Sequence, residues 1–155
     1  MDFRIERIEY ELRLAGRGKS VKTSRAAKDI SSHWSSAKKD GFMQKLIDMS
    51  WENPQCTLES LLGVCGENAA ITDEEFTYFM GVRYDGDPPS HMETLTIPPS
   101  TWAVFPKVSD AWKHLYTEWL PASGYELGNT PCIECFYPPK HKPRNELWVP
   151  VVQKQ

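Results

Sequence analysis

Residues 76–84, Phe-Thr-Tyr-Phe-Met-Gly-Val-Arg-Tyr, have the clearest structural pattern in this sequence. Every second residue from Phe76 to Tyr84 is apolar or aromatic, which is the period of a β-strand that buries one face. A similar alternation at residues 3–15 predicts a strand with one wet face, and residues 58–66 predict a further strand. The first half of the chain is therefore expected to contribute three strands to a sheet.

Two helices are expected between the first strand and the second. Residues 16–20, Gly-Arg-Gly-Lys-Ser, predict a flexible loop, and Thr23 or Ser24 is expected to cap a helix that ends near residue 38. A shorter helix is expected to begin at Phe42 and to end at Trp51-Glu52-Asn53-Pro54. Helices and strands thus alternate in the order strand, helix, strand, strand.

The second half of the chain repeats this order. The expected elements are a turn at 85–89, a strand at 91–105 with a kink or an edge position at Ile97-Pro98-Pro99, a helix from Ser109 to Leu120, and strands at 131–137 and 146–152. We therefore expect one α+β domain over residues 1–155, built from duplicated halves at about 1–86 and 87–155. Its strands would form an antiparallel sheet, with two main helices on one face and a central cleft.

Composition and charge exclude several classes of protein. The net charge of −3 gives no general attraction to nucleic acid, and no apolar run reaches the length of about 20 residues that spans a membrane. The N-terminus lacks the pattern of a secretion signal and no helix-turn-helix precedes residue 3, so we expect a cytoplasmic protein that does not bind DNA directly.

Cys132-Ile-Glu-Cys135 has the spacing of zinc-binding or redox cysteine pairs. On a strand, however, residues three apart point to opposite faces, so these two thiols are expected to be small apolar residues of the core. The four histidines are scattered, and the sequence holds no HExxH motif, serine nucleophile elbow or glycine-rich phosphate loop. We expect neither a metal nor a cofactor.

Glu134 lies between Ile133 and Cys135 in an apolar strand, and the chain is rich in aromatic residues, with six each of Trp, Tyr and Phe. These rings predict either a large core or a pocket lined by aromatic side chains. A glutamate on a strand is ordinarily on the wet face, so the residue pattern leaves open whether Glu134 is an edge charge or a buried functional group.

Several stretches resemble one known family in order and spacing, over nearly the whole chain. They are Phe76 to Val82, Met92-Glu-Thr-Leu-Thr-Ile-Pro-Pro-Ser-Thr-Trp-Ala-Val-Phe105, Tyr116-Thr-Glu-Trp-Leu-Pro-Ala-Ser-Gly-Tyr-Glu126, Ile133-Glu134 and Glu146-Leu-Trp-Val-Pro-Val151. The sequence is similar here to the GyrI-like family, the AraC-type effector-binding domains of bacterial transcription activators. The resemblance implies the duplicated fold described above, with a ligand cleft between the halves.

The resemblance also implies a pocket for cationic, lipophilic small molecules, in which a glutamate sits among aromatic rings. Glu134 matches that glutamate, and the ligand-binding residues implied with it are Trp148, Trp34, Tyr78, Trp119, Phe105 and Tyr125. Trp119 and Tyr125 belong to the family motif and are alternatively part of the core. The chain departs from the family at Lys107-Val108, where glycine and proline are common, and at Phe136, where a tyrosine is common.

The resemblance leaves three functions open. A stand-alone domain of this kind senses or sequesters its ligand, as a monomer or homodimer, and passes any signal to a protein partner. Some members hydrolyse strained cyclopropane-bearing compounds, for which Glu134 would be the general base and Tyr78 would orient the electrophile. Other stand-alone relatives inhibit a topoisomerase through an outer surface, which would leave the pocket incidental.

Overall fold

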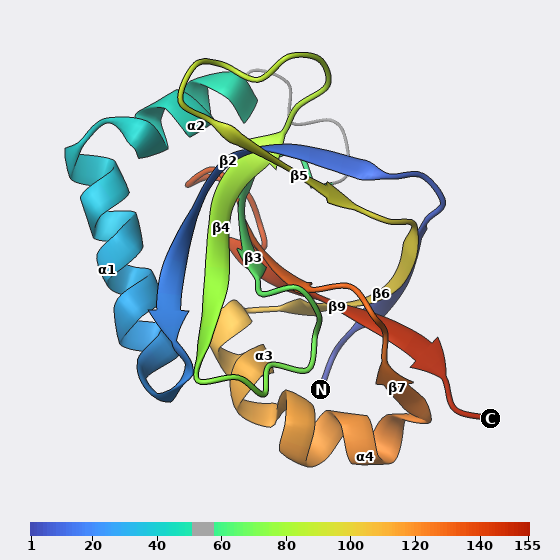
Figure 1. Ribbon diagram of the computed structural model, residues 1–155. Helices are drawn as coiled ribbons and strands as arrows, with labels where there is room; N and C mark the ends of the chain where they lie inside the picture. The colour runs from blue at the N-terminus through green and yellow to red at the C-terminus, as the bar shows by residue number, and fades with distance from the viewer. Residues whose placement is uncertain (51–57) are drawn as a thin grey trace.

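The computed structural model describes residues 1–50 and 58–155, and its described residues contain nine strands (Figure 1). The strands are β1 (Arg4–Ile8), β2 (Leu12–Lys22), β3 (Leu61–Cys65), β4 (Glu75–Arg83), β5 (Glu93–Ile97), β6 (Ser100–Pro106), β7 (Tyr125–Leu127), β8 (Cys132–Phe136) and β9 (Asn145–Gln153). All their pairings are antiparallel, in the order β1-β6-β9-β8-β3-β4-β2-β5, and β7 pairs with β9 outside this path. The antiparallel α+β class predicted from the sequence is therefore confirmed.

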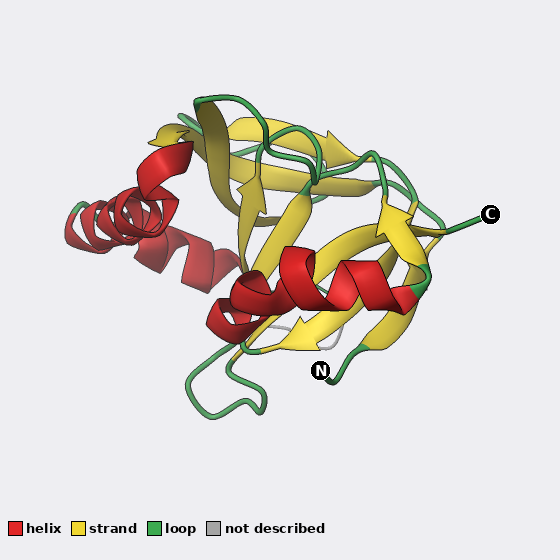
Figure 2. Cartoon of the chain, turned by 90° about the horizontal axis from the view of Figure 1, so that it is seen from below, coloured by secondary structure: helices red, strands yellow, loops and turns green. Residues whose placement is uncertain are grey.

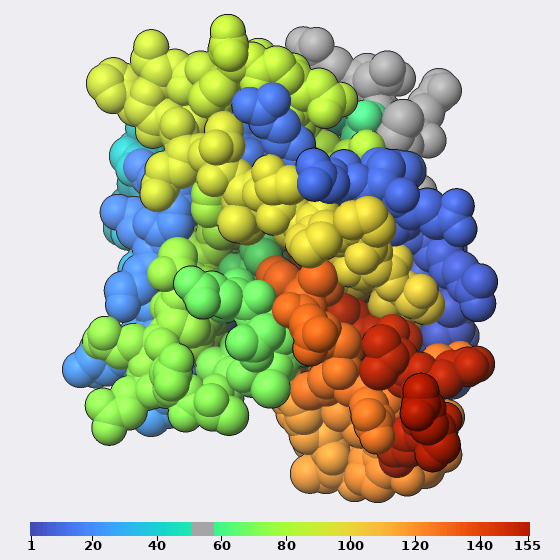
Figure 3. Space-filling view, turned by 45° about the vertical axis from the view of Figure 1, so that its right-hand side comes forward, coloured from blue at the N-terminus to red at the C-terminus, as the bar shows by residue number. Residues whose placement is uncertain are grey.

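The sheet is strongly curved. Strands β1 and β6 lie at one end of the strand order and β2 and β5 at the other, yet only residues 9–11 connect β1 to β2. Residues 98–99 alone connect β5 to β6, so the two ends of the sheet must approach each other. In the space-filling view the N-terminal residues lie against the segment that contains β5 and β6 (Figure 3). The expected kink at Pro98-Pro99 is thus a break between two strands, because neither proline can donate to a ladder.

The predicted loop at residues 16–20 is wrong, because these residues lie inside β2. Gly16 is paired with Gly81 of β4, and a Cβ atom on Gly16 would lie 2.0 Å from the carbonyl oxygen of Met80. The glycine therefore permits a close approach of two strands instead of forming a turn.

Two groups of helices cover the sheet (Figure 2). The first is the 3₁₀ turn η1 (Thr23–Arg25), α1 (Ala26–Lys39) and α2 (Phe42–Ser50), and the second is α3 (Val108–His114), the π-helix η2 (Leu115–Trp119) and α4 (Leu120–Ser123). The expected caps are wrong: the residue before α1 is Arg25, which makes no side-chain cap, and Thr23 donates to the carbonyl of Asp73 instead. The expected end of the shorter helix at residues 51–54 lies outside the described residues.

The second helical group also runs further than expected. Pro121 lies at the start of α4, directly after the π-helix η2, and the helical path continues past Leu120. Gly124, with a φ of 77°, ends the path in the left-handed conformation that glycine adopts readily. None of the helices in the described ranges is both long and apolar enough to cross a membrane.

The two faces of the sheet bury different clusters. Ile133 and Cys135 of β8 belong to a core on the face without helices, whereas Cys132 belongs to a cluster beneath α3 and η2. The two cysteines thus lie on opposite faces, as the strand alternation predicts. A third cluster lies beneath α1 and α2, so the helical face carries two separate apolar clusters. The order of elements is compatible with duplicated halves, and the duplication itself remains a prediction.

Candidate functional site

A pocket of about 1190 Å³ lies on the helical face of the sheet, between α1 and the α3–η2 segment. Most of its wall is apolar or aromatic. Among the residues that line it are Ser31, Trp34, Lys38, Trp112, Tyr116 and Glu134. The volume is ample for a drug-sized molecule, since typical ligand pockets enclose about 300–1,000 Å³.

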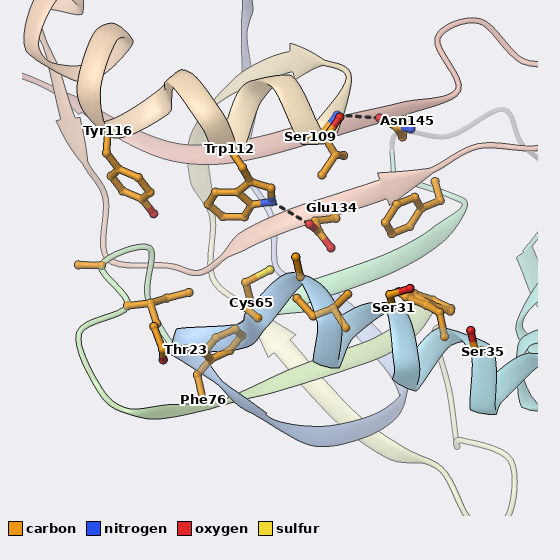
Figure 4. A pocket seen from close by; sticks show the side chains of 18 of the residues that line it. Thr23, Ser31, Ser35, Cys65, Phe76, Ser109, Trp112, Tyr116, Glu134 and Asn145 are labelled. Carbon is orange, nitrogen blue, oxygen red and sulfur yellow. Dashed lines mark hydrogen bonds between the residues drawn. The ribbon is translucent and has the colours of Figure 1, made fainter.

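Glu134 lies at the floor of this pocket and is only 5% exposed. The hydroxyl of Tyr78 donates a hydrogen bond to Oε1 of Glu134 at 2.7 Å. Nε1 of Trp112 donates to Oε2 at 2.7 Å, and Figure 4 draws this second bond as a dashed line. Each carboxylate oxygen therefore accepts a hydrogen bond from an aromatic side chain. Donors on both oxygens fix the orientation of the carboxylate and suit its ionised form.

Tyr78 reaches Glu134 across an intervening strand. Tyr78 is on β4 and Glu134 is on β8, and β3 lies between them, with Gly63 opposite Glu134 in the register. A Cβ atom on Gly63 would lie 1.8 Å from the hydroxyl oxygen of Tyr78, so only glycine leaves room for the tyrosine ring. Nε1 of Trp34 on α1 donates to the same hydroxyl at 2.9 Å. Both helical groups are thereby connected to one carboxylate.

Burial dominates the electrostatics of Glu134. Loss of water raises the pKa of Glu134, and the hydrogen bonds from Trp112 and Tyr78 lower it only in part, so that the net shift is upward. No Lys, Arg or His side chain of residues 1–50 or 58–155 forms an ion pair with Glu134. Burial and the neighbouring carboxylate also raise the pKa of Tyr78, which therefore remains a neutral donor.

Glu146 is a second buried carboxylate and, unlike Glu134, it forms an ion pair. Nη1 of Arg4 donates to its Oε2 at 2.6 Å, and the hydroxyl of Tyr137 donates to its Oε1. Burial raises the pKa of Glu146, but the hydrogen bonds from Arg4 and Tyr137 outweigh burial and hold the pKa below its usual value. One buried acid thus has a counter-charge within the protein, and Glu134 has none among the described residues.

The structure brings together three of the residues expected at the site, and places a fourth elsewhere. Trp34 and Glu134 line the pocket, and Tyr78 is hydrogen bonded to both. Trp148 is 1% exposed in the core on the other face of the sheet, where its ring packs edge-on against Trp102. Its expected role as a pocket wall is corrected, because it lies opposite Ile133 in the β8–β9 register, on the face away from Glu134.

Trp119, Phe105 and Tyr125 also lie away from the pocket. They belong to the cluster beneath α3 and η2, with the Trp119 ring 4.9 Å from Phe105 and 5.8 Å from Tyr125 between centroids. None of them is among the residues that line the pocket. These three residues are therefore outside the wall of this pocket, and their expected contacts with a ligand stay predictions. The alternative of a structural role for Trp119 and Tyr125 fits their packing.

Three further residues shape the site although the sequence pattern does not point to them: Trp112, Tyr116 and Gly63. Trp112 and Tyr116 lie on the apolar stripe of their helix, where the pattern alone predicts core residues, but both rings line the pocket and stack with centroids 6.3 Å apart. The hydroxyl of Tyr116 donates to the carbonyl of Ala69, which ties η2 to the β3–β4 connection. Their spacing of four residues was visible in the sequence, whereas nothing in the sequence distinguishes Gly63 from other strand glycines.

Comparison with known proteins identifies the family. Residues 1–152 match the model of the GyrI-like small-molecule-binding domain, which is nearly the whole chain. The chain belongs to the GyrI-like family. This assignment confirms the family expected from the sequence and makes the chain a small-molecule-binding domain. A search of curated protein sequences found no match.

Solved structures share the GyrI-like fold at low sequence identity. SAV2435 bound to tetraphenylphosphonium is 18% identical, with a TM-score of 0.76 over 98% of this chain and 94% of that one. A putative bacterial transcription regulation protein from Staphylococcus aureus MU50 is also 18% identical, with a TM-score of 0.69 over 100% and 99%. The EcmrR C-terminal domain is 16% identical, with a TM-score of 0.57 over 98% of each chain. At these identities the likeness establishes the fold alone.

Proposed function

We propose that this GyrI-like domain binds cationic, lipophilic small molecules and that Glu134 supplies the counter-charge. The observation that carries the proposal is a carboxylate at the pocket floor that has hydrogen-bond donors on both oxygens and no described cation beside it. Such a domain would sense or sequester its ligand. A partner protein and the oligomeric state stay predictions.

The energetics of the carboxylate favour a cationic guest. An ionised carboxylate removed from water carries a penalty of several kcal/mol unless an opposite charge offsets it. A cation in the pocket provides that charge. The rings of Trp34, Trp112 and Tyr116 add attraction of roughly 0.5–2 kcal/mol each where the cation lies over a ring face. Flat aromatic walls fit cations of many shapes, so broad selectivity is expected.

The ligand of one structural neighbour supports this choice of compound. SAV2435 binds tetraphenylphosphonium, a lipophilic cation. The same cation is therefore a reasonable first probe for this chain. Tetraphenylborate has the same four-ring shape and the opposite charge, so the two ions form a matched pair that isolates the effect of charge.

The test is the binding of both ions to the native chain and to Glu134→Gln, measured by calorimetry. Glutamine keeps the shape of the side chain and removes its charge, so we expect the affinity for tetraphenylphosphonium to fall at least about tenfold. The affinity for tetraphenylborate should stay the same or rise. Retained anion binding would also demonstrate that the variant pocket is intact.

Glu146→Gln is the matched control, because it neutralises a buried carboxylate that is already paired with Arg4 on the other face of the sheet. This variant is expected to lose stability and to keep the native preference for the cation. Equal affinity of the native chain and Glu134→Gln for tetraphenylphosphonium would contradict the proposal.

A hydrolase with Glu134 as general base is the second candidate, because burial raises the pKa of this glutamate. The geometry favours binding over this chemistry. The hydroxyl of Tyr78 donates to Glu134 itself, so it is not available to orient the electrophile of a substrate.

A further inference from the structure

Helix α1 presents two adjacent stripes to the pocket region. Ala26, Ile30, Trp34 and Ala37 pack against the apolar cluster beneath the helix. The next stripe, offset by one residue, is Ala27, Ser31, Ser35 and Lys38, all of which line the pocket. Figure 4 shows Ser31 and Ser35 on the side of α1 that faces β8. We call Ser31, Ser35 and Lys38 the donor stripe.

The donor stripe has no partner in the described part of the chain. The structure records no hydrogen bond or ion pair from Ser31, Ser35 or Lys38 to residues 1–50 or 58–155. Two ion pairs lie on or near α1, Arg17–Asp40 and Arg25–Asp29, and neither involves the donor stripe. The stripe therefore offers two hydroxyls and one ammonium group to whatever enters the pocket.

The two charges of the pocket are separate. Among its described lining residues, Glu134 is the one acid and Lys38 the one base. Lys38 lies one helical turn beyond Trp34, about 6 Å further along the axis of α1. Trp34 is itself connected to Glu134 only through Tyr78. No ion pair joins Lys38 to Glu134 among the described residues, so the two charges are available to different groups of a ligand.

We infer that the ligand of this pocket is amphoteric: an aromatic or lipophilic cation that also carries a carboxylate. Its cationic centre lies at Glu134, and its carboxylate lies at the rim, where Lys38 pairs with it and Ser31 or Ser35 donates a hydrogen bond. This inference rests on the proposed function and narrows its class of compound. Lys38 then determines specificity without determining whether a cation binds.

The expected effect of Lys38 is modest because the side chain is exposed. Ion pairs between exposed groups add little to a binding free energy, so loss of the Lys38 pair should change the affinity about two- to fivefold. The contribution should shrink as the salt concentration rises, since salt screens exposed charges.

Rhodamine B and its ethyl ester are suitable probes, because they share one cationic ring system. Rhodamine B has a free carboxylate and is zwitterionic at neutral pH, whereas esterification removes the negative charge. Fluorescence anisotropy gives the affinity of each dye for the native chain, for Lys38→Gln and for Lys39→Gln. Lys39 is the matched control, since it neighbours Lys38 on α1, is exposed and does not line the pocket.

We expect the ratio of acid to ester affinity to fall about two- to fivefold in Lys38→Gln and to stay at the native value in Lys39→Gln. The ester should bind the native chain and Lys38→Gln equally well. An unchanged ratio in Lys38→Gln, with both dyes still bound, would overturn the inference and leave the proposed function intact. Failure of both dyes to bind the native chain would count against the proposed function as well.

Discussion

Replacement of Gly63 by alanine is expected to lower the free energy of unfolding by about 2–4 kcal/mol. The new methyl group would lie 1.8 Å from the hydroxyl oxygen of Tyr78 and 2.3 Å from its Cζ, so the ring must move. That movement separates Tyr78 from Glu134 and leaves a buried carboxylate oxygen without its donor. Urea denaturation followed by tryptophan fluorescence measures the loss of stability.

A double substitution attributes this loss to the ring. Gly63→Ala should lower the free energy of unfolding much less in a Tyr78→Leu background, because the shorter side chain no longer crosses Gly63. Residues in direct contact give such non-additive effects, whereas independent residues give additive ones. Additive losses, or an alanine at position 63 without effect on stability, would contradict the assigned role of the glycine.

Local pattern was sufficient to predict most elements of this fold. The alternation at residues 76–84 predicts β4, and the helix expected from Ser109 to Leu120 corresponds to the second group of helices. Each of these two patterns arises because a single strand or helix buries one apolar face, so it is visible within the element's own sequence. The prolines at 98 and 99 predict a kink or an edge but not a break, since a lone strand does not reveal that its two parts pair at opposite ends of a curved sheet.

The errors at Trp148, Gly16 and Gly63 concern interactions between strands distant in the sequence. Trp148 and Leu147 alternate along β9, but which of them faces the helices depends on the pairing of β9 with β8. The sequence contains no direct record of that register. The roles of Gly16 and Gly63 also depend on other strands and so could not be predicted from the local pattern. Gly16 is required by the close backbone of Met80, and Gly63 is required by the ring of Tyr78.

Glu134 was identified through family resemblance, and the structure supplies its physical setting. Burial in an apolar strand places the side chain away from water, and the long reach of Tyr78 and Trp112 provides the donors. Neither donor lies near Glu134 in the sequence. The two buried glutamates also differ because of tertiary contacts. Glu146 is paired with Arg4, whereas Glu134 has no cation beside it among the described residues.

These two acids are expected to affect stability in opposite directions as the pH changes. The pKa of Glu146 is lowered in the folded protein, so its contribution is present above the ordinary carboxyl range and is lost as the pH falls through the lowered value. The pKa of Glu134 is raised, so the folded protein retains a proton that the unfolded chain has lost. Its contribution therefore decreases as the pH rises from the ordinary carboxyl pKa to the raised one.

The raised pKa of Glu134 predicts that cation binding depends steeply on pH. A lipophilic cation favours the ionised carboxylate, so the pKa of Glu134 should be lower in the complex than in the free protein. Between those two values, binding releases a proton, and the affinity for tetraphenylphosphonium should rise by up to about tenfold per pH unit. Above the raised pKa of the free protein, the affinity should become constant. Calorimetry at several pH values, in buffers of different ionisation enthalpy, measures both the affinity and the number of protons released.

The variant Glu134→Gln tests whether the proton that is released on binding comes from Glu134. Glutamine does not titrate, so the variant should bind the cation weakly, with little pH dependence and no proton release. Glu146→Gln should retain the native slope, because the remaining carboxylate at Glu134 is unchanged and lies on the other face of the sheet. A native profile that is flat from the ordinary carboxyl range upward would mean that Glu134 is already ionised in the empty pocket. The donors Tyr78 and Trp112 would then hold the carboxylate in its ionised form by themselves, which would contradict the raised pKa of Glu134 while its attraction for a cation remained.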